Sequence, residues 1–308
     1  MPRTTGRNLF NLPVFILLAS VFLHASFAHA WGNEGHRIIN RLAAANLPAD
    51  VPVFLHSEAA INEIEYLGPE PDRWRSPAEP ELNAVQSPEH FLNFEPADAL
   101  GTLPHRRLDF DAMAFSAGQR PEKIGFQPWE ATEVWERLKA ALREYRGLSG
   151  AHQDTRAVEQ AAIFYAGWLG HYVGDASQPL HTTIQYNGWI GPNPNGYTTA
   201  HTIHWQFEGP FVGANLHAAD IQTHMTPARA LEGDVFTDYM AYLRQTSKYI
   251  EKVYQLEKVG GFEGQGSQES RDFTADRLAA GASMLRDMIY SAWLQSGNPV
   301  PDPHASGK

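Results

Sequence analysis

With 308 residues, of which 43% are hydrophobic and 19% charged, the chain can bury a core and is not a disordered tail. Its formal net charge of −11 excludes a diffuse basic surface that wraps duplex nucleic acid. The absence of cysteine excludes disulfides, thiolate zinc fingers, iron–sulfur clusters and a cysteine nucleophile, whereas histidine occurs 14 times.

Residues 1–30 have the pattern of a secretory signal peptide. Arg3 and Arg7 precede an apolar run from Leu9 to Leu23, and Ala28-His29-Ala30 forms an A-x-A cleavage pattern. The apolar run is too short and interrupted for a comfortable membrane span, so we favour cleavage over an uncleaved anchor. Cleavage between Ala30 and Trp31 predicts a secreted or periplasmic protein, and it gives Trp31 a free α-amine that can bind a metal together with its carbonyl.

The rest of the chain reads as helices joined by loops rich in proline and glycine. Five segments repeat apolar residues at helical intervals: Ile38–Ala45, Val134–Leu142, Ala161–Leu169, Tyr239–Tyr249 and Leu278–Trp293. We therefore predict a single all-α domain over residues 31–298 and a disordered tail over residues 299–308. Two long loops, at about 68–107 and 182–200, are expected to carry function.

Three candidate metal ligands lie in the first third of the domain. His36 follows Trp31 after glycines that let the backbone bring the Trp31 amine and the imidazole together. Asp72 and His90 lie in the first expected loop. Either of them alone is more typical of a solvated side chain or a helix cap.

The densest pattern is His171-x-x-x-Asp175, followed by His181. The first two side chains lie one turn apart on one face of a predicted helix, and Pro179 ends that helix before His181. A buried His–Asp pair whose members satisfy each other explains His171 and Asp175 equally well when the pair is taken alone.

A second pair with the same spacing is His204-x-x-x-Glu208, and His201 is a competing ligand that ranks second to His204. Such a pair is weak evidence alone, but it follows the glycine-rich loop that begins at His181. Without thiolates, imidazole nitrogens and carboxylate oxygens are the ligands available to zinc.

In this order, the residues resemble the metal ligands of the phospholipase C/P1 nuclease superfamily. The matching motifs are Trp31-Gly-x-x-Gly-His36, Asp72-x-x-Arg75, His90-Phe91, His171-x-x-x-Asp175-x-x-Gln-Pro-x-His181 and His204-x-x-x-Glu208. The resemblance implies a mostly helical fold of that type, with long functional loops and three zinc ions in a cleft. Beyond Glu208 the chain resembles the superfamily only as helices.

Carried over position by position, the resemblance implies which residues hold each zinc. The first zinc would be held by Asp72, His90, His171 and Asp175, the second by His181, His204 and Glu208, and the third by the Trp31 amine and carbonyl, His36 and a bridging Asp175. The implied sites leave open positions, which distinguish catalytic zinc from structural zinc.

The implied reaction is phosphodiester hydrolysis by a zinc-bridged hydroxide. Two zincs that share Asp175 would also share a water and lower its pKa from about 15.7 toward 7. Asp72 and Asp175 are therefore the expected catalytic residues, and no side chain has to be the nucleophile. Arg75 is expected to bind the substrate phosphate or to orient Asp72, and an exposed salt bridge is the competing explanation.

Several features favour single-stranded DNA or RNA as the substrate. They are the compact Trp31–His36 start, the wide spacing from His181 to His204, and Phe91, which stands where the nucleases have an aromatic that stacks on a base. Core packing explains Phe91 equally well by residue type.

Other features depart from the nuclease pattern. Glu208 is a glutamate, as in the phospholipases, and Asn93 stands where the nucleases carry an acidic residue that contacts the base. Asn93 is nevertheless a candidate substrate-binding residue. We rank an S1/P1-type nuclease first, a zinc-dependent phospholipase C that acts on phospholipid head groups second, and a non-catalytic zinc- or ligand-binding protein third. The sequence does not specify an oligomeric state.

Overall fold

The computed structural model describes Met1 and residues 31–231 and 233–300. Apart from Met1, the expected signal peptide lies outside the described residues, and so do residues 301–308 of the expected tail.

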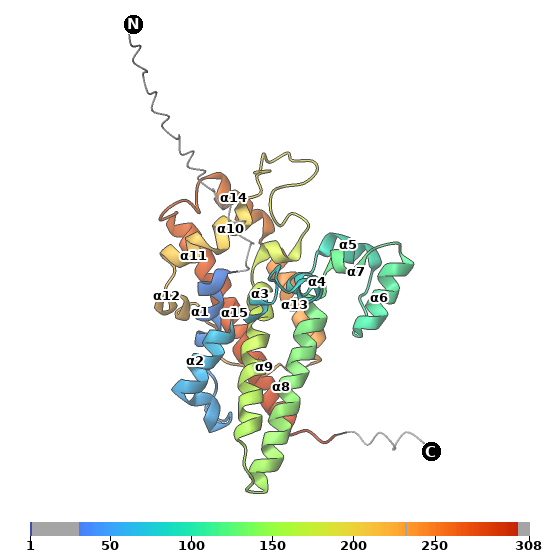
Figure 1. Ribbon diagram of the computed structural model, residues 1–308, viewed down its shortest axis with the longest axis vertical. Coiled ribbons are helices and arrows are strands. Elements are labelled where there is room, and N and C mark those ends of the chain that lie inside the picture. The colour runs from blue at the N-terminus through green and yellow to red at the C-terminus, as the bar shows by residue number, and fades with distance from the viewer. Residues whose placement is uncertain (2–30, 232, 301–308) are drawn as a thin grey trace.

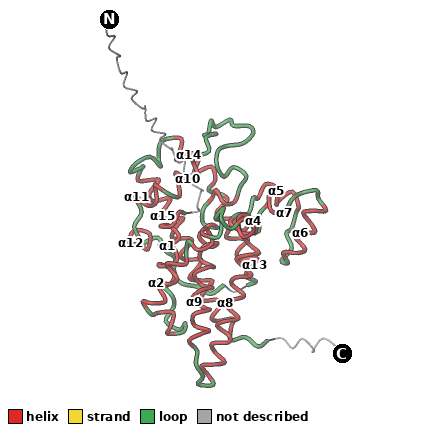
Figure 2. The backbone as a smooth tube through the Cα atoms, viewed as in Figure 1, coloured by secondary structure: helices red, strands yellow, loops and turns green. Residues whose placement is uncertain are grey.

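The described residues form helices and loops and no strand, which confirms the predicted all-α class (Figure 2). The long helices are α1 (Gly32–Ala45), α2 (Glu58–Leu67), α6 (Arg107–Ser116), α8 (Gln127–Gly150), α9 (Arg156–Asp175), α13 (Val235–Ser247), α14 (Ile250–Lys258) and α15 (Gln268–Ser296). The short helices are α3 (Glu70–Arg73), α4 (Pro80–Gln86), α5 (Phe94–Leu100), α7 (Pro121–Ile124), α10 (Ile203–Glu208), α11 (Pro210–Asn215) and α12 (Ala218–Gln222). Three 3₁₀ helices complete them: η1 (Val53–His56), η2 (Ser87–His90) and η3 (Pro179–Thr182). Within the described residues, no helix is both long and apolar enough to span a membrane.

Helices α8 and α9 form a long antiparallel hairpin, and α15 packs against both of them and against α1 (Figure 1). Helix α9 can occupy this central place because its apolar side chains recur every three or four residues, as at Ile163, Ala166, Leu169 and Val173, all of which are buried. Its C-terminal end therefore lies deep in the molecule, where it carries the densest ligand pattern of the sequence.

A buried amide fixes the position of α1 against this hairpin. Asn40 on α1 donates hydrogen bonds from Nδ2 to the carbonyl oxygens of Ile64 on α2, at 2.8 Å, and Gly167 on α9, at 2.9 Å. Such satisfied buried polar contacts favour one relative placement of the helices. Residues near the start of α1 are thereby brought toward the end of α9.

The first of the two expected loops is not a loop. Residues 68–107 contain α3, α4, η2 and α5, which are short helices whose first turns are rich in proline. Proline suits the first turn of a helix, because the N–H that it lacks has no partner there. The second expected loop does lack helices, since residues 183–200 run without one from η3 toward α10.

Helices α5, α6 and α7 project from the side of the molecule (Figure 1). The chain returns from this projection through Gly125, which has a φ of 107° and lies against the carbonyl of Phe91. A side chain there would collide with that backbone, so glycine permits the close approach of the projection to the segment around His90.

Candidate metal centre

The last turn of α9 presents His171 and Asp175 on one face, and both are fully buried. Their Nε2 and Oδ2 atoms lie 3.4 Å apart. As the sequence predicts, the i, i+4 spacing places an imidazole and a carboxylate side by side. The other expected ligands gather around this pair.

Asp72 and His90 meet His171 in a first cluster. The Nδ1 atom of His90 lies 2.9 Å from Nε2 of His171 and 3.0 Å from Oδ2 of Asp175. Oδ1 of Asp72 is 3.9 Å from each of the same two imidazole nitrogens. One potential ligand atom from each of Asp72, His90 and His171 lies within 4.8 Å of the others, which suits a shared cation.

His181, His204 and Glu208 form a second cluster. Nε2 of His181 lies 3.1 Å from Nε2 of His204. Oε2 of Glu208 lies 3.0 Å from Nε2 of His204 and 3.8 Å from Nε2 of His181. Helix α10 provides His204 and Glu208 on one face, whereas His201 precedes the helix and is exposed. The structure thus brings His204, and not His201, to the cluster.

His36 completes a third cluster with the α9 pair. Its Nε2 atom lies 3.3 Å from Oδ1 of Asp175, and its ring stacks on that of His171 with centroids 4.1 Å apart. The two oxygens of Asp175 therefore face different ways, Oδ1 toward His36 and Oδ2 toward His90 and His171. This is the geometry of a carboxylate that can bridge two cations.

Trp31 is anchored close to this third cluster. Its indole Nε1 donates to the carbonyl of Gly174 and to Oγ of Ser177, both at 2.8 Å, and the residue is fully buried. The Trp31 backbone is left-handed, with φ 45°, and its carbonyl accepts the N–H of Gly35 at 3.0 Å. The expected coordination by the Trp31 amine and carbonyl stays a prediction.

Backbone carbonyls orient three of the histidines. Nδ1 of His171 lies 2.8 Å from the carbonyl oxygen of Gly68. Nδ1 of His181 lies 2.6 Å from the carbonyl oxygen of His90. Nδ1 of His204 lies 3.0 Å from the carbonyl oxygen of Tyr186. A carbonyl can only accept, so each Nδ1 must carry the proton and donate it. In the neutral imidazole each Nε2 is then left as an acceptor aimed into its cluster, an arrangement typical of metal ligands.

The electrostatics of the side chains fit divalent cations. Burial lowers the pKa of His90 and of His171 well below the usual histidine value, and neighbouring Arg75 lowers it further for His90. These imidazoles are thus neutral, as metal ligands must be. Burial raises the pKa of Asp175 well above its usual value, and the nearby carboxylates of Asp72 and Glu208 raise it further, so a cation bound there would relieve a concentration of negative charge.

Two buried carboxylate oxygens also indicate that the clusters bind cations. Among the described residues, Oδ1 of Asp175 and Oε1 of Glu208 are buried and have no hydrogen-bond partner. Buried polar atoms are nearly always satisfied, and a cation satisfies a carboxylate oxygen directly. The donor set contains only imidazole and carboxylate groups, which zinc accepts. The residues present therefore fit the expected metal.

The first and second clusters open onto a cleft of about 460 Å³. His90, His181 and His204 line it, and so do all three expected substrate-binding residues, Arg75, Phe91 and Asn93. Arg75 also donates from Nη1 to Oδ1 of Asp72 at 3.3 Å, so phosphate binding and orientation of Asp72 are both open to it. Phe91 is half-buried at the wall of the cleft and is not a core residue.

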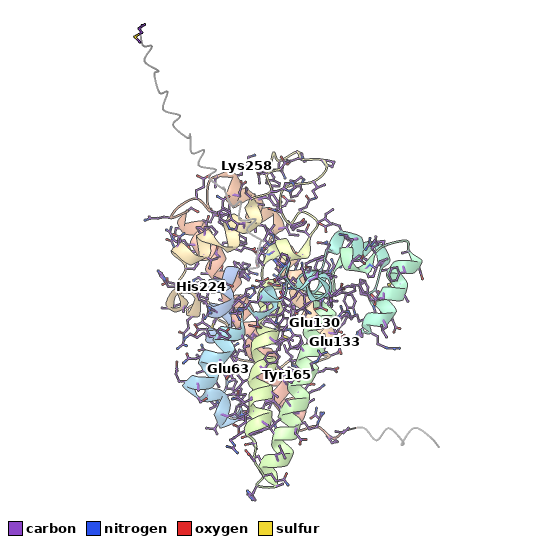
Figure 3. The ribbon with its side chains drawn as sticks, viewed as in Figure 1. Glu63, Glu130, Glu133, Tyr165, His224 and Lys258 are labelled. Carbon is purple, nitrogen blue, oxygen red and sulfur yellow. The ribbon has the colours of Figure 1, made fainter. Side chains whose placement is uncertain are left out.

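A buried charge cluster behind the site was not expected from the sequence. Arg107, at the start of α6, lies between the carboxylates of Glu89 on η2 and Glu130 on α8, with N–O distances of 2.9 and 3.3 Å. Figure 3 labels Glu130 beside Glu133 on α8. No residue spacing links these positions, and only the occurrence of Glu89 next to His90 hinted at a role.

The pKa of Glu130 makes the stability of the protein sensitive to pH. Burial and the neighbouring carboxylates of Glu89 and Glu133 together raise that pKa from 4.5 to about 8, against the opposing effect of Arg107. Between pH 4.5 and 8 the unfolded chain releases this proton while the folded chain keeps it, so wild-type stability declines as the pH rises. Glu130→Gln removes this decline, because glutamine does not titrate. The free energy of unfolding of this variant, relative to that of wild type, should therefore rise by a few kcal/mol from pH 4.5 to 8, since each unit of pKa difference is worth about 1.4 kcal/mol.

Urea unfolding of both proteins at pH 5 and pH 8.5 measures the effect. Glu136→Gln is the matched control, because Glu136 lies on the same helix with its side chain 63% exposed. An equal stability difference at the two pH values for Glu130→Gln would contradict the prediction.

Comparisons with known proteins identify one family, and two of the solved structures that resemble this chain are alpha toxins. The family model described as S1/P1 Nuclease matches residues 31–300. The alpha toxin of Clostridium absonum is 14% identical, with a TM-score of 0.43 and coverage of 87% of this chain. The alpha-toxin of Clostridium perfringens from an avian strain is 13% identical, with a TM-score of 0.42 and the same coverage. The chain spans 66% and 64% of the lengths of these two toxins. No curated protein sequence matches the chain.

Proposed function

The chain belongs to the S1/P1 nuclease family, and on that premise we propose that it is a secreted, zinc-dependent phosphodiesterase that hydrolyses single-stranded nucleic acid. The family is one of phosphoric ester hydrolases. The observation that carries the proposal is the position of Asp175, whose two oxygens face two different ligand clusters beside a cleft lined by Phe91.

We assign three zinc ions to the three clusters. One belongs to Asp72, His90, His171 and Asp175, one to His181, His204 and Glu208, and one to His36, Asp175 and the backbone of Trp31. This assignment includes removal of residues 1–30 as a signal peptide, since only cleavage gives Trp31 a free amine.

The bound zinc ions would supply the attacking group, a water whose pKa they lower toward neutrality. The chain itself positions and encloses the reaction. Asp175 and Asp72 provide the carboxylates that fix the cations, and burial keeps the imidazoles of His90 and His171 neutral. Arg75 provides a guanidinium at the cleft that can pair with a phosphate oxygen. Phe91 offers an aromatic face for an unpaired base.

The cleft supports nucleic acid over phospholipid. Phe91 adjoins the ligand His90 and lines the cleft, so a base can stack on it while its phosphate lies at the metal clusters. Lys123, on α7, lines the same cleft and adds a second cation to that of Arg75. Glu122 lines it too, so the charged lining side chains other than the ligands are net positive, which favours a polyanionic strand over the zwitterionic head group of phosphatidylcholine.

A substrate comparison tests the proposal. The mature chain is incubated with single-stranded DNA, single-stranded RNA, duplex DNA and phosphatidylcholine micelles, each with and without chelator. We expect chelator-sensitive cleavage of the single strands. Cleavage of lipid alone would establish the phospholipase alternative, and no chelator-sensitive hydrolysis of any substrate would favour a zinc- or ligand-binding protein.

Phe91→Ala is expected to raise KM for single-stranded DNA by about 5- to 100-fold, because base–aromatic stacking contributes about 1–3 kcal/mol per base. The zinc content should not change, since Phe91 provides no ligand. Steady-state kinetics and metal analysis of the same preparation check both statements. Phe115→Ala, which removes an exposed phenylalanine on α6, is the control. An unchanged KM would remove Phe91 from the substrate site.

A further inference from the structure

Arg107 joins three elements that are far apart in the sequence. Its Nη2 donates to Oε1 of Glu89 on η2 at 2.9 Å, and its Nη1 donates to Oε2 of Glu130 on α8 at 3.3 Å. Glu89 and Glu130 are 2% and 5% exposed, so both contacts lie in the interior. The guanidinium also lies over the ring of Phe126, 4.4 Å from its centroid. Such a fork holds two carboxylates in one geometry.

Two further hydrogen bonds connect Glu89 to helix α9. Nε2 of Gln86 donates to Oε2 of Glu89 at 2.7 Å, and the hydroxyl of Tyr172 donates to Oε1 of Gln86 at 3.0 Å. Glu89 directly precedes His90, and Tyr172 directly follows His171. The network therefore links the backbone neighbours of two ligands of the first cluster.

Backbone contacts make the segment around His90 responsive to this network. The N–H of Phe126 donates to the carbonyl of Pro88 at 2.7 Å, and Nε2 of Gln127 donates to the carbonyl of His90 at 3.1 Å. Both partners lie at the beginning of α8, the helix that carries Glu130. Arg107 thus fixes η2 against α8 without lining the cleft.

We propose that Arg107 is a positioning residue for the first zinc site, which holds the His90 imidazole in register with His171 by bridging Glu89 and Glu130. The proposal rests on the assignment of zinc to Asp72, His90, His171 and Asp175. Arg107 does not line the cleft at the clusters and touches neither substrate nor metal, so it acts only through the placement of His90.

A purely structural role for Arg107 makes a different prediction. Loss of a buried ion bridge would then lower the stability of the whole protein and leave zinc affinity unchanged once the chain is folded. Positioning, in contrast, weakens one zinc site selectively. The two roles are separable because zinc affinity and unfolding are measured independently.

The decisive protein is the double variant Arg107→Met/Glu130→Gln. Methionine keeps an apolar contact with Phe126, and glutamine removes one of the two buried carboxylates that would otherwise lack a cationic partner. Glu130→Gln alone keeps the contact between Arg107 and Glu89. Arg107→Lys retains charge, but its ammonium cannot bridge two carboxylates as a guanidinium does. The matched control is Arg106→Met, because Arg106 adjoins Arg107 and has a side chain that is 74% exposed.

Zinc binding is measured by chelator competition, together with zinc content, kcat and thermal unfolding. For the double variant we expect one of the zinc ions to bind at least about tenfold more weakly than in wild type, in line with other residues that orient metal ligands. The kcat should fall at limiting zinc and recover when free zinc is raised. Arg107→Lys and Glu130→Gln, which each weaken the bridge without removing it, should be intermediate, and Arg106→Met should bind zinc as wild type does.

A double variant that melts at a lower temperature but binds every zinc with wild-type affinity would overturn the proposal. Should the double variant fail to fold, weaker zinc binding by a folded Arg107→Lys supports the proposal and wild-type zinc binding by it overturns the proposal. Wild-type protein that binds no zinc would overturn the proposed function together with this inference, whereas equal zinc binding by wild type and double variant overturns the inference alone.

Discussion

Asp175→Asn is expected to abolish hydrolysis and to reduce the zinc content from three ions per chain to one. Oδ1 of Asp175 faces His36 at 3.3 Å, and Oδ2 faces His90 at 3.0 Å, so one side chain contributes to two clusters. Asparagine keeps the shape of the side chain but removes its negative charge. Because both clusters lose the same carboxylate, two ions should be released and the cluster of His181, His204 and Glu208 should retain the third.

The fold of this variant should survive the change. Burial raises the pKa of Asp175 well above its usual value, so ionisation of this carboxyl costs stability as the pH rises when no cation is bound. In chelator at pH 8, Asp175→Asn should therefore unfold at a temperature no lower than wild type does. Asp276→Asn, at an exposed position on α15, is the control for the loss of one acidic side chain. Full zinc content in Asp175→Asn would contradict the assignment of Asp175 as a bridging ligand.

The sequence could predict the parts of the site that lie on single helices. His171 and Asp175, like His204 and Glu208, are four residues apart, and helical geometry alone places each pair on one face. Apolar periodicity likewise identified the segments that became α9 and α15. These features are local, so no knowledge of the tertiary structure was needed to find them.

The meeting of Asp72 and His90 with α9 could not be derived from residue spacing. These residues lie on short helices, and a helix of four residues has too few positions to show a period. For that reason residues 68–107 were expected to be a loop. Only the ordered resemblance to the superfamily indicated that they approach His171.

The ionic network next to the first cluster could not be predicted from the sequence for another reason. Glu89, Arg107 and Glu130 lie on three different elements, and single charged residues are usually found on a solvated surface. Burial of Glu89 and Glu130, and of most of the Arg107 side chain, depends on the way α6 meets η2 and α8. Lys123 enters the cleft through the projection of α5, α6 and α7. Tertiary arrangement, and not local pattern, gives these residues their roles.

A mature chain with one extra glycine before Trp31 is expected to lose one of three zinc ions and most of its activity. The indole of Trp31 is held by Gly174 and Ser177, both at 2.8 Å, so the residue is fixed beside the end of α9 whatever precedes it. His36 faces Oδ1 of Asp175 at that same end. A free α-amine has a lone pair for zinc near neutral pH, since its pKa is about 8, whereas a peptide nitrogen has none to offer.

Metal analysis of chains that begin at Trp31, or at a glycine before it, tests this second prediction. The same glycine added to the C-terminus controls for the extra residue. Trp31→Phe, in a chain that begins at residue 31, removes the indole hydrogen bonds but keeps the amine, so it should bind the third zinc more weakly without losing it outright. Equal zinc content in the extended and unextended chains would show that His36 and Asp175 bind their ion without the amine. Processing at Ala30 would then serve export alone, and the catalytic centre would be complete before cleavage.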